Sequence, residues 1–156
     1  MMPSTPETKQ IIDRLAGTCQ DAQEGFEAAA ALVADSALKA ELLQYSLQCA
    51  DFLADLERLR LELGETPDFR QATPNANHHG WTHLNGLIDA SDVAVLAACA
   101  RGTETAMTAY RRALNTILPE FVAVVVASQC HAIWQVYECI RALRTASMRK
   151  AANVHG

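Results

Sequence analysis

The sequence of 156 residues contains no Glu-x-x-His motif, because every glutamate is followed three positions later by a residue other than histidine. Four-helix bundles that hold a di-iron or di-manganese centre carry this motif on two of their helices, and its side chains project into the bundle. The absence of the motif argues against a standard di-metal carboxylate centre.

Glycine and proline are scarce, with seven and five copies, while half of the residues are apolar. This composition is typical of an all-helical protein, since both residues are kept out of helix interiors. Long apolar runs are also missing: the most apolar stretch, Ile117 to Ser128, contains Pro119 and Glu120 and is too short to span a bilayer. Residues 1–9 do not resemble a secretory signal. We therefore expect no membrane association and a cytoplasmic location.

The formal net charge of −5 gives no general attraction to nucleic acid. The five cysteines form no Cys-x-x-Cys pair, and each falls within a helical pattern, so they are interpreted as reduced core residues. No serine or cysteine has a histidine at a recognisable catalytic spacing, and no glycine-rich phosphate loop is present. An enzyme is therefore the less favoured interpretation.

Four segments repeat apolar residues every three or four positions, which predicts helices over about residues 6–34, 36–63, 92–117 and 119–143. Asp35 or Ser36 can cap the second helix and Ser91 or Asp92 the third. The second helix has the most regular stripe, with alternating steps of four and three, as in bundles of nearly antiparallel helices. Its members are Leu38, Leu42, Tyr45, Cys49, Phe52, Leu56, Leu59 and Leu63.

Residues 64–91 form a long connection that contains Gly64, Pro67 and Pro74, and a short helix is predicted from Pro74 to about Ile88. The short links make helices one and two, and three and four, antiparallel neighbours. The long link allows the second hairpin to start at the same end as the first, which is the ferritin-like topology. We predict one ferritin-like all-α domain over residues 1–156, with frayed ends at about 1–5 and 146–156.

Several local strings resemble a bacterial family of small ferritin-like proteins of unknown function, over about residues 10–145. The strings are Cys19–Phe26, Asp35–Lys39 with Tyr45-Ser46, His78-His-Gly-Trp81, Cys99–Glu104 with Ala109–Arg111, and Gln129 with Ile140–Arg144. The His78-to-Trp81 string is similar to a His-x-Gly-Trp motif in the crossover of that family. The resemblance implies the bundle fold and no particular activity.

Two sets of residues are candidates for a site. Asp55 and Glu104 flank the inward stripes of their helices and, with His78 of the crossover, could bind iron, manganese or zinc. Solvated charges and salt bridges are the favoured alternative for these carboxylates. Tyr45, Tyr110 and Gln129 fall on inward positions and could line a ligand pocket in the core.

Gly25 and Gly102 interrupt predicted helices, where glycine costs about 1 kcal/mol relative to alanine. They are interpreted as positions of close helix approach, as room for Trp81 or Tyr110, or as tolerated weak points. A homodimer is expected from small-residue faces, which comprise Ala28 to Ala31, Ala97, Ala98 and Ala100.

Taken together, the sequence favours a cytoplasmic bundle with a non-enzymatic binding or stress-associated role and no cofactor. The alternative is a noncanonical metal-binding oxidoreductase or metal-storage protein that uses the bundle carboxylates.

Overall fold

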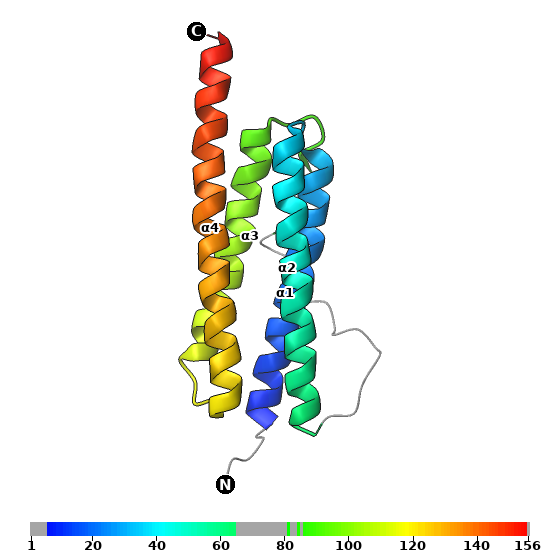
Figure 1. Cartoon of the computed structure of the whole chain (residues 1–156), viewed down its shortest axis with the longest axis vertical. Helices are drawn as coiled ribbons and strands as arrows, with labels where there is room; N and C mark the ends of the chain where they lie inside the picture. The colour runs from blue at the N-terminus through cyan, green and yellow to red at the C-terminus, as the bar shows by residue number, and fades with distance from the viewer. Residues whose placement is uncertain (1–5, 65–80, 82–83, 85, 156) are drawn as a thin grey trace.

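The computed structural model describes residues 6–64, 81, 84 and 86–155, and these contain four helices and no strand (Figure 1). The helices are α1 (Pro6–Leu32), α2 (Ser36–Glu62), α3 (Asp92–Leu114) and α4 (Glu120–His155). The prediction of an all-α bundle is confirmed for this part of the chain. The predicted short helix from Pro74 to Ile88 falls mostly outside the described residues.

Two polar side chains set the beginnings of the inner helices. The Asp35 carboxylate accepts hydrogen bonds from the backbone N–H groups of Ala37 and Leu38, at 2.8 and 3.1 Å. The Ser91 hydroxyl oxygen accepts one from the N–H of Ala94 at 3.2 Å. Each cap satisfies N–H groups that have no partner within the helix. The sequence-based prediction of helix starts at these residues is confirmed.

The direction of the helices follows from contacts at the two ends of the bundle. Asp92, at the start of α3, accepts hydrogen bonds from the backbone N–H groups of Ala34 and Asp35, at 2.8 and 3.1 Å. Near the opposite end, Arg60 of α2 forms an ion pair with Asp13 of α1 at 3.1 Å. The helix α3 therefore begins at the end where α1 turns into α2, and α2 and α3 run in the same direction (Figure 1).

Helix α4 is longer than the sequence pattern indicates, because it continues to His155 where fraying is predicted from about residue 146. In Figure 1 its end projects beyond the other three helices. The Lys150 ammonium group forms an ion pair with Asp35 at 3.3 Å, which ties the extension to the turn between α1 and α2. Residues 146–152 are also mostly good helix formers. Among the described residues, no helix has the length and apolar character needed to cross a membrane.

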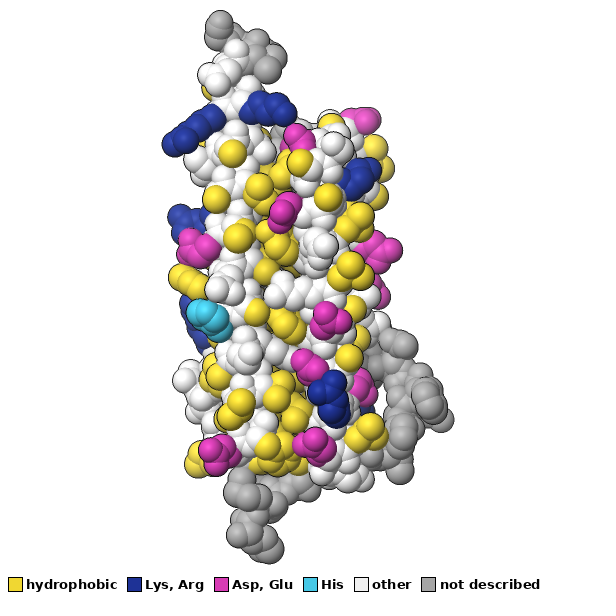
Figure 2. Space-filling view, viewed as in Figure 1, with side chains coloured by type: hydrophobic (Ala, Val, Ile, Leu, Met, Phe, Trp, Pro, Cys, Tyr) yellow, Lys and Arg dark blue, Asp and Glu magenta, His cyan; other side chains and the backbone are white. Residues whose placement is uncertain are grey.

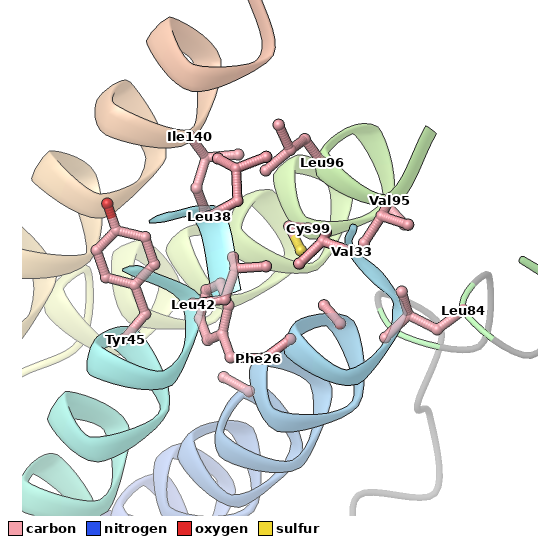
Figure 3. Packing of buried hydrophobic residues seen from close by; sticks show 14 of the residues in the cluster. Phe26, Val33, Leu38, Leu42, Tyr45, Leu84, Val95, Leu96, Cys99 and Ile140 are labelled. Atoms are coloured by element: carbon pink, nitrogen blue, oxygen red, sulfur yellow. The ribbon is translucent and has the colours of Figure 1, made fainter. Parts of the chain in front are cut away.

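The buried apolar residues form two clusters along the bundle axis. The upper cluster, near the turn between α1 and α2, brings together Phe26, Leu42, Leu96 and Ile140 from the four helices (Figure 3). The lower cluster, toward the other end, includes Leu15, Leu56, Tyr110 and Val126. The neighbouring pairs are α1 with α2, α3 with α4, α1 with α3 and, least extensively, α2 with α4. The pairs α1/α4 and α2/α3 therefore lie on the diagonals.

The rotation of two helices differs slightly from the predicted stripes. The apolar spacing of residues 6–34 and 119–143 predicts that Ile11, Val125 and Ala132 face inward. The buried residues are instead Ile12 in α1 and Val126 and Ile133 in α4. The small-residue faces assigned to a dimer are also partly used within the chain, because Ala29, Ala30 and Ala98 are buried in its own core. The interior of a single bundle thus accounts for part of these small-residue faces.

Candidate functional site

A chain of hydrogen bonds crosses the lower cluster and takes one group from each helix. The Tyr110 hydroxyl of α3 donates to Oε1 of Gln129 of α4 at 2.6 Å, and Nε2 of Gln129 donates to the backbone carbonyl of Phe52 of α2 at 3.1 Å. The Sγ atom of Cys19 of α1 lies 3.1 Å from the Tyr110 oxygen. Tyr110 and Gln129 are both buried. We call these four groups the polar chain.

The polar chain is electrically neutral. Burial raises the pKa of the Tyr110 hydroxyl well above its ordinary value, and it raises the pKa of the Cys19 thiol to about 12. The same cause raises the pKa of the Cys99 thiol to about 12 and that of Cys49 further. Because the thiolate is the reactive form of cysteine, these three thiols are poor nucleophiles at neutral pH. Within the described residues, every buried side-chain nitrogen and oxygen has a hydrogen-bond partner.

A cavity of about 20 Å³ lies beside the polar chain. This volume suits about one water molecule and is far below the several hundred Å³ of typical ligand pockets. Its wall is almost entirely apolar in exposed surface. The lining residues are Thr18, Cys19, Ala22, Phe26, Gln48, Cys49, Phe52, Thr103, Ala106, Ile133 and Val136.

The structure brings together two of the three residues predicted to line a ligand pocket. Tyr110 and Gln129 are hydrogen-bonded to each other. Tyr45 belongs to the upper cluster, where its ring packs against Phe26 with centroids 5.5 Å apart. The periodicity placed all three side chains inward, but it carried no information about their levels along the bundle.

The predicted metal ligands lie on different parts of the surface. Asp55 of α2 forms an ion pair with Arg58 at 3.1 Å. Glu104 of α3 accepts a hydrogen bond from the Tyr137 hydroxyl at 2.9 Å, and that contact raises the pKa of Tyr137. The helices α2 and α3 lie on a diagonal. Among the described residues, no group of three or more His, Cys, Asp and Glu side chains could hold a metal.

His78 lies outside the described residues, so its predicted role as a metal ligand remains a prediction. At the contact between Glu104 and Tyr137, a carboxylate and a phenol oxygen meet between α3 and α4. Glu24 of α1 is exposed.

Trp81 packs into a notch between α1 and α3. A Cβ atom built on Gly25 or on Gly102 would overlap the indole ring, so an alanine at either position is incompatible with this placement of Trp81. The indole also makes an edge-on contact with Phe26, with ring centroids 4.9 Å apart. The interpretation of the two glycines as room for Trp81 is confirmed. We call the space that Gly25 and Gly102 leave between α1 and α3, which the Trp81 ring occupies, the tryptophan notch.

A family model described as a domain of unknown function (DUF2383) matches residues 7–116. The chain belongs to this family. The match covers α1, α2 and α3 and therefore includes the whole tryptophan notch, whereas Gln129 of the polar chain lies beyond it. No curated protein matches the chain. The resemblance to a family of unknown function is thus confirmed, and its ferritin-like character remains a prediction.

The sequence indicates some members of the polar chain and not the others. Gln129 occupies an inward position of an otherwise apolar stripe, which marks a buried amide that needs partners. Cys19 and the carbonyl of Phe52 could not be found in this way, since a cysteine at an inward position is ordinary and a backbone carbonyl has no sequence signature.

Proposed function

We propose that this protein is a non-enzymatic, cytoplasmic protein with a binding or stress-associated role, built on a ferritin-like bundle that has no standard di-metal centre. The observation that carries the proposal is the polar chain. In di-metal bundles the carboxylates and histidines of facing helices project into the interior. In the lower cluster here, tyrosine, glutamine and cysteine side chains form a hydrogen-bonded chain between the helices, and these side chains are neutral.

The state of the interior supports the same proposal. The buried thiols have raised pKa values, and the cavity beside them has a volume of only about 20 Å³. Covalent catalysis needs an activated nucleophile with a base within reach and room for a substrate. The raised thiol pKa values disfavour an activated cysteine nucleophile in this core, and the small cavity leaves no room for a substrate. Recognition at the outer helix faces is therefore the better-supported role.

The test is the metal content of protein purified without a histidine tag, measured by elemental analysis. We expect no stoichiometric iron, manganese or zinc, and no thermal stabilisation when these metals are added, since a bound metal stabilises the folded state. The same measurements on Asp55→Ala/Glu104→Ala, with Glu24→Ala as an exposed-carboxylate control, should then show no difference in metal content.

The alternative is a noncanonical metal-binding oxidoreductase or metal-storage protein that uses Asp55, Glu104 and His78. The observation in its favour is the contact between Glu104 and Tyr137, because a carboxylate and a phenol oxygen already meet there. Near-stoichiometric metal that is lost in Asp55→Ala/Glu104→Ala and retained in Glu24→Ala would establish this alternative and reject the binding-protein proposal.

A further inference from the structure

A groove with a volume of about 630 Å³ lies between α1 and α3, beside the lower cluster. Its apolar part is formed by Ile11 and Leu15 of α1 and by Ala109 and Ala113 of α3. The volume falls in the range of pockets that bind small molecules, whereas the cavity beside the polar chain is far too small for one. We call this space the α1/α3 groove.

Each helix contributes one arginine to the groove, Arg14 from α1 and Arg112 from α3. Neither guanidinium group forms an ion pair with a described residue. No aspartate or glutamate of the described part of the chain lines the groove. On the face formed by α2 and α4, by contrast, acidic and basic side chains are mixed (Figure 2). Two positive charges therefore meet at the groove without a described acidic neighbour to neutralise them.

The two arginines lie at nearly the same level along the bundle. A Cβ atom on Gly25 or on Gly102 would overlap the same ring atom, Cδ2 of Trp81, so these two glycines share a level. Since α1 and α3 run in opposite directions, Arg14, eleven residues before Gly25, and Arg112, ten residues after Gly102, are displaced toward the same end. The remaining difference of one residue is about 1.5 Å along the axis. A single anion in the groove is thus within reach of both long side chains.

Three threonines of α3 also line the groove, but their hydroxyl hydrogens are used within the helix. Thr105 and Thr108 each donate to the backbone carbonyl four positions earlier at 3.1 Å, and Thr116 donates to the carbonyl of Ala113 at 2.6 Å. The two guanidinium groups are therefore the donors that the groove offers to an anion.

We propose that the α1/α3 groove binds a phosphate monoester with an apolar organic group, and that the phosphate lies between Arg14 and Arg112. A phosphate monoester carries a charge of about −1.5 to −2 at pH 7 and three acceptor oxygens, which match two guanidinium groups. A carboxylate supplies only one charge. The organic group packs against Ile11, Ala109 and Ala113. This inference rests on the proposed binding role and gives that role a ligand class.

The first experiment is calorimetric titration of the full chain with phenyl phosphate, with benzoate and phenol as comparison ligands. One phenyl phosphate should bind per chain, benzoate should bind at least ~10-fold more weakly, and phenol should not bind measurably, because the anion contacts fall away in that order. Added salt should weaken the binding of phenyl phosphate. A chain that does not bind phenyl phosphate, or binds phenol equally well, would overturn the proposal.

The second experiment locates the binding site by substitution. Arg14→Ala and Arg112→Ala should each weaken the binding of phenyl phosphate by at least ~10-fold, because each variant loses charge-assisted hydrogen bonds. Both side chains are exposed, so the melting temperature without ligand should stay nearly unchanged. The matched control is Arg101→Ala, since Arg101 is an exposed arginine of α3 that does not line the groove. It should bind phenyl phosphate as the wild type does. An equal loss in all three variants would show a general charge effect and reject the site.

These results are separate from the test of the proposed function. Failure to bind phenyl phosphate overturns the groove and its ligand class, and it leaves the metal content unchanged. Stoichiometric metal that is lost in Asp55→Ala/Glu104→Ala rejects the binding-protein proposal whatever the groove binds.

Discussion

The two halves of the bundle core are stabilised in different ways. In the upper cluster the ring of Trp81, which comes from outside the four helices, packs against Gly25 and Gly102. In the lower cluster the polar chain links a side chain or carbonyl from every helix. The upper half is specified by the fit of a ring against two glycines, and the lower half by hydrogen bonds, which need particular donor and acceptor directions. The two halves should therefore respond differently to the same kind of mutation.

In the upper cluster, the packing of Trp81 depends on the absence of a side chain at Gly25 and Gly102. Because Gly25 and Gly102 lie on different helices, the notch exists only when α1 and α3 are in the correct register. Trp81 then buries apolar surface against both helices and against Phe26. Shape thus fixes the relative position of α1 and α3.

In the lower cluster, stability depends on every member of the polar chain having its hydrogen-bond partner. A buried donor or acceptor that loses its partner carries the full cost of its desolvation, whereas replacing both partners by apolar groups can be almost neutral. The polar chain therefore favours the one arrangement of four helices in which all its members meet.

The largest effect should come from removing the ring that fills the notch. Trp81→Ala is expected to lower the free energy of unfolding by about 3 kcal/mol, because a large aromatic contact is lost and a void remains between α1 and α3. Chemical denaturation measures this change. The matched control is Trp134→Ala, since Trp134 lies on the surface of α4 with 42% exposure, and its cost should stay below about 1 kcal/mol. Equal losses for both variants would contradict the role of the notch.

A somewhat smaller effect is expected when the notch is closed rather than emptied. Gly102→Ala should destabilise the protein by about 2 kcal/mol, because the new methyl group displaces the indole. An ordinary helical glycine would show the opposite sign and gain up to about 1 kcal/mol.

A double-mutant cycle isolates the cause. In the Trp81→Ala background, Gly102→Ala should become neutral or stabilising, since nothing remains for the methyl group to displace. If the alanine were equally harmful in both backgrounds, the steric explanation would be wrong.

Breaking the polar chain should cost less but should be strongly non-additive. Tyr110→Phe and Gln129→Leu are each expected to destabilise by about 1–2 kcal/mol, because each leaves a buried partner without its hydrogen bond. The double variant should lose less than the sum of the two. Tyr137→Phe, which removes an exposed hydrogen bond, is the control and should cost under about 0.5 kcal/mol. Strict additivity in thermal or chemical denaturation would show that the two side chains act independently.

The smallest effect concerns the surface at the turn between α1 and α2. The pKa of Asp35 is lowered, first by the hydrogen bond from the Leu38 backbone, then by Lys150 and by the Ala37 backbone. Its carboxylate therefore contributes stability above the pKa of the unfolded chain, and this contribution is lost as the pH falls through the lower pKa of the folded state. Asp35→Asn keeps a good cap but cannot titrate. Its melting temperature should fall less on acidification than that of the wild type, and parallel curves would contradict the assignment.

The sequence was sufficient for the secondary structure because local rules govern it. Asp35 and Ser91 are the observed caps, and apolar spacing gives four helices with ends close to those observed, except for the C-terminal end of α4. The sequence was less accurate for the rotation of each helix about its own axis, which decides the residues that face the core. On α4, Val126 is buried where the spacing favours its neighbour Val125, although Gln129 and Val136 are buried as expected. Packing against the two neighbouring helices decides such a small rotation, and periodicity in a single helix does not contain it.

The site shows the same division. The inward position of Tyr110 and Gln129 was determined by the sequence, and room for a large side chain was one of three interpretations that it left open for Gly25 and Gly102. Which of the aromatic residues fills the notch, that Tyr45 lies in a different cluster from Tyr110, and that Asp55 and Glu104 belong to diagonal helices were decided only by the tertiary structure. The physical reason is that a periodic pattern fixes the face of a helix, whereas the level at which two helices meet depends on contacts between residues far apart in the chain.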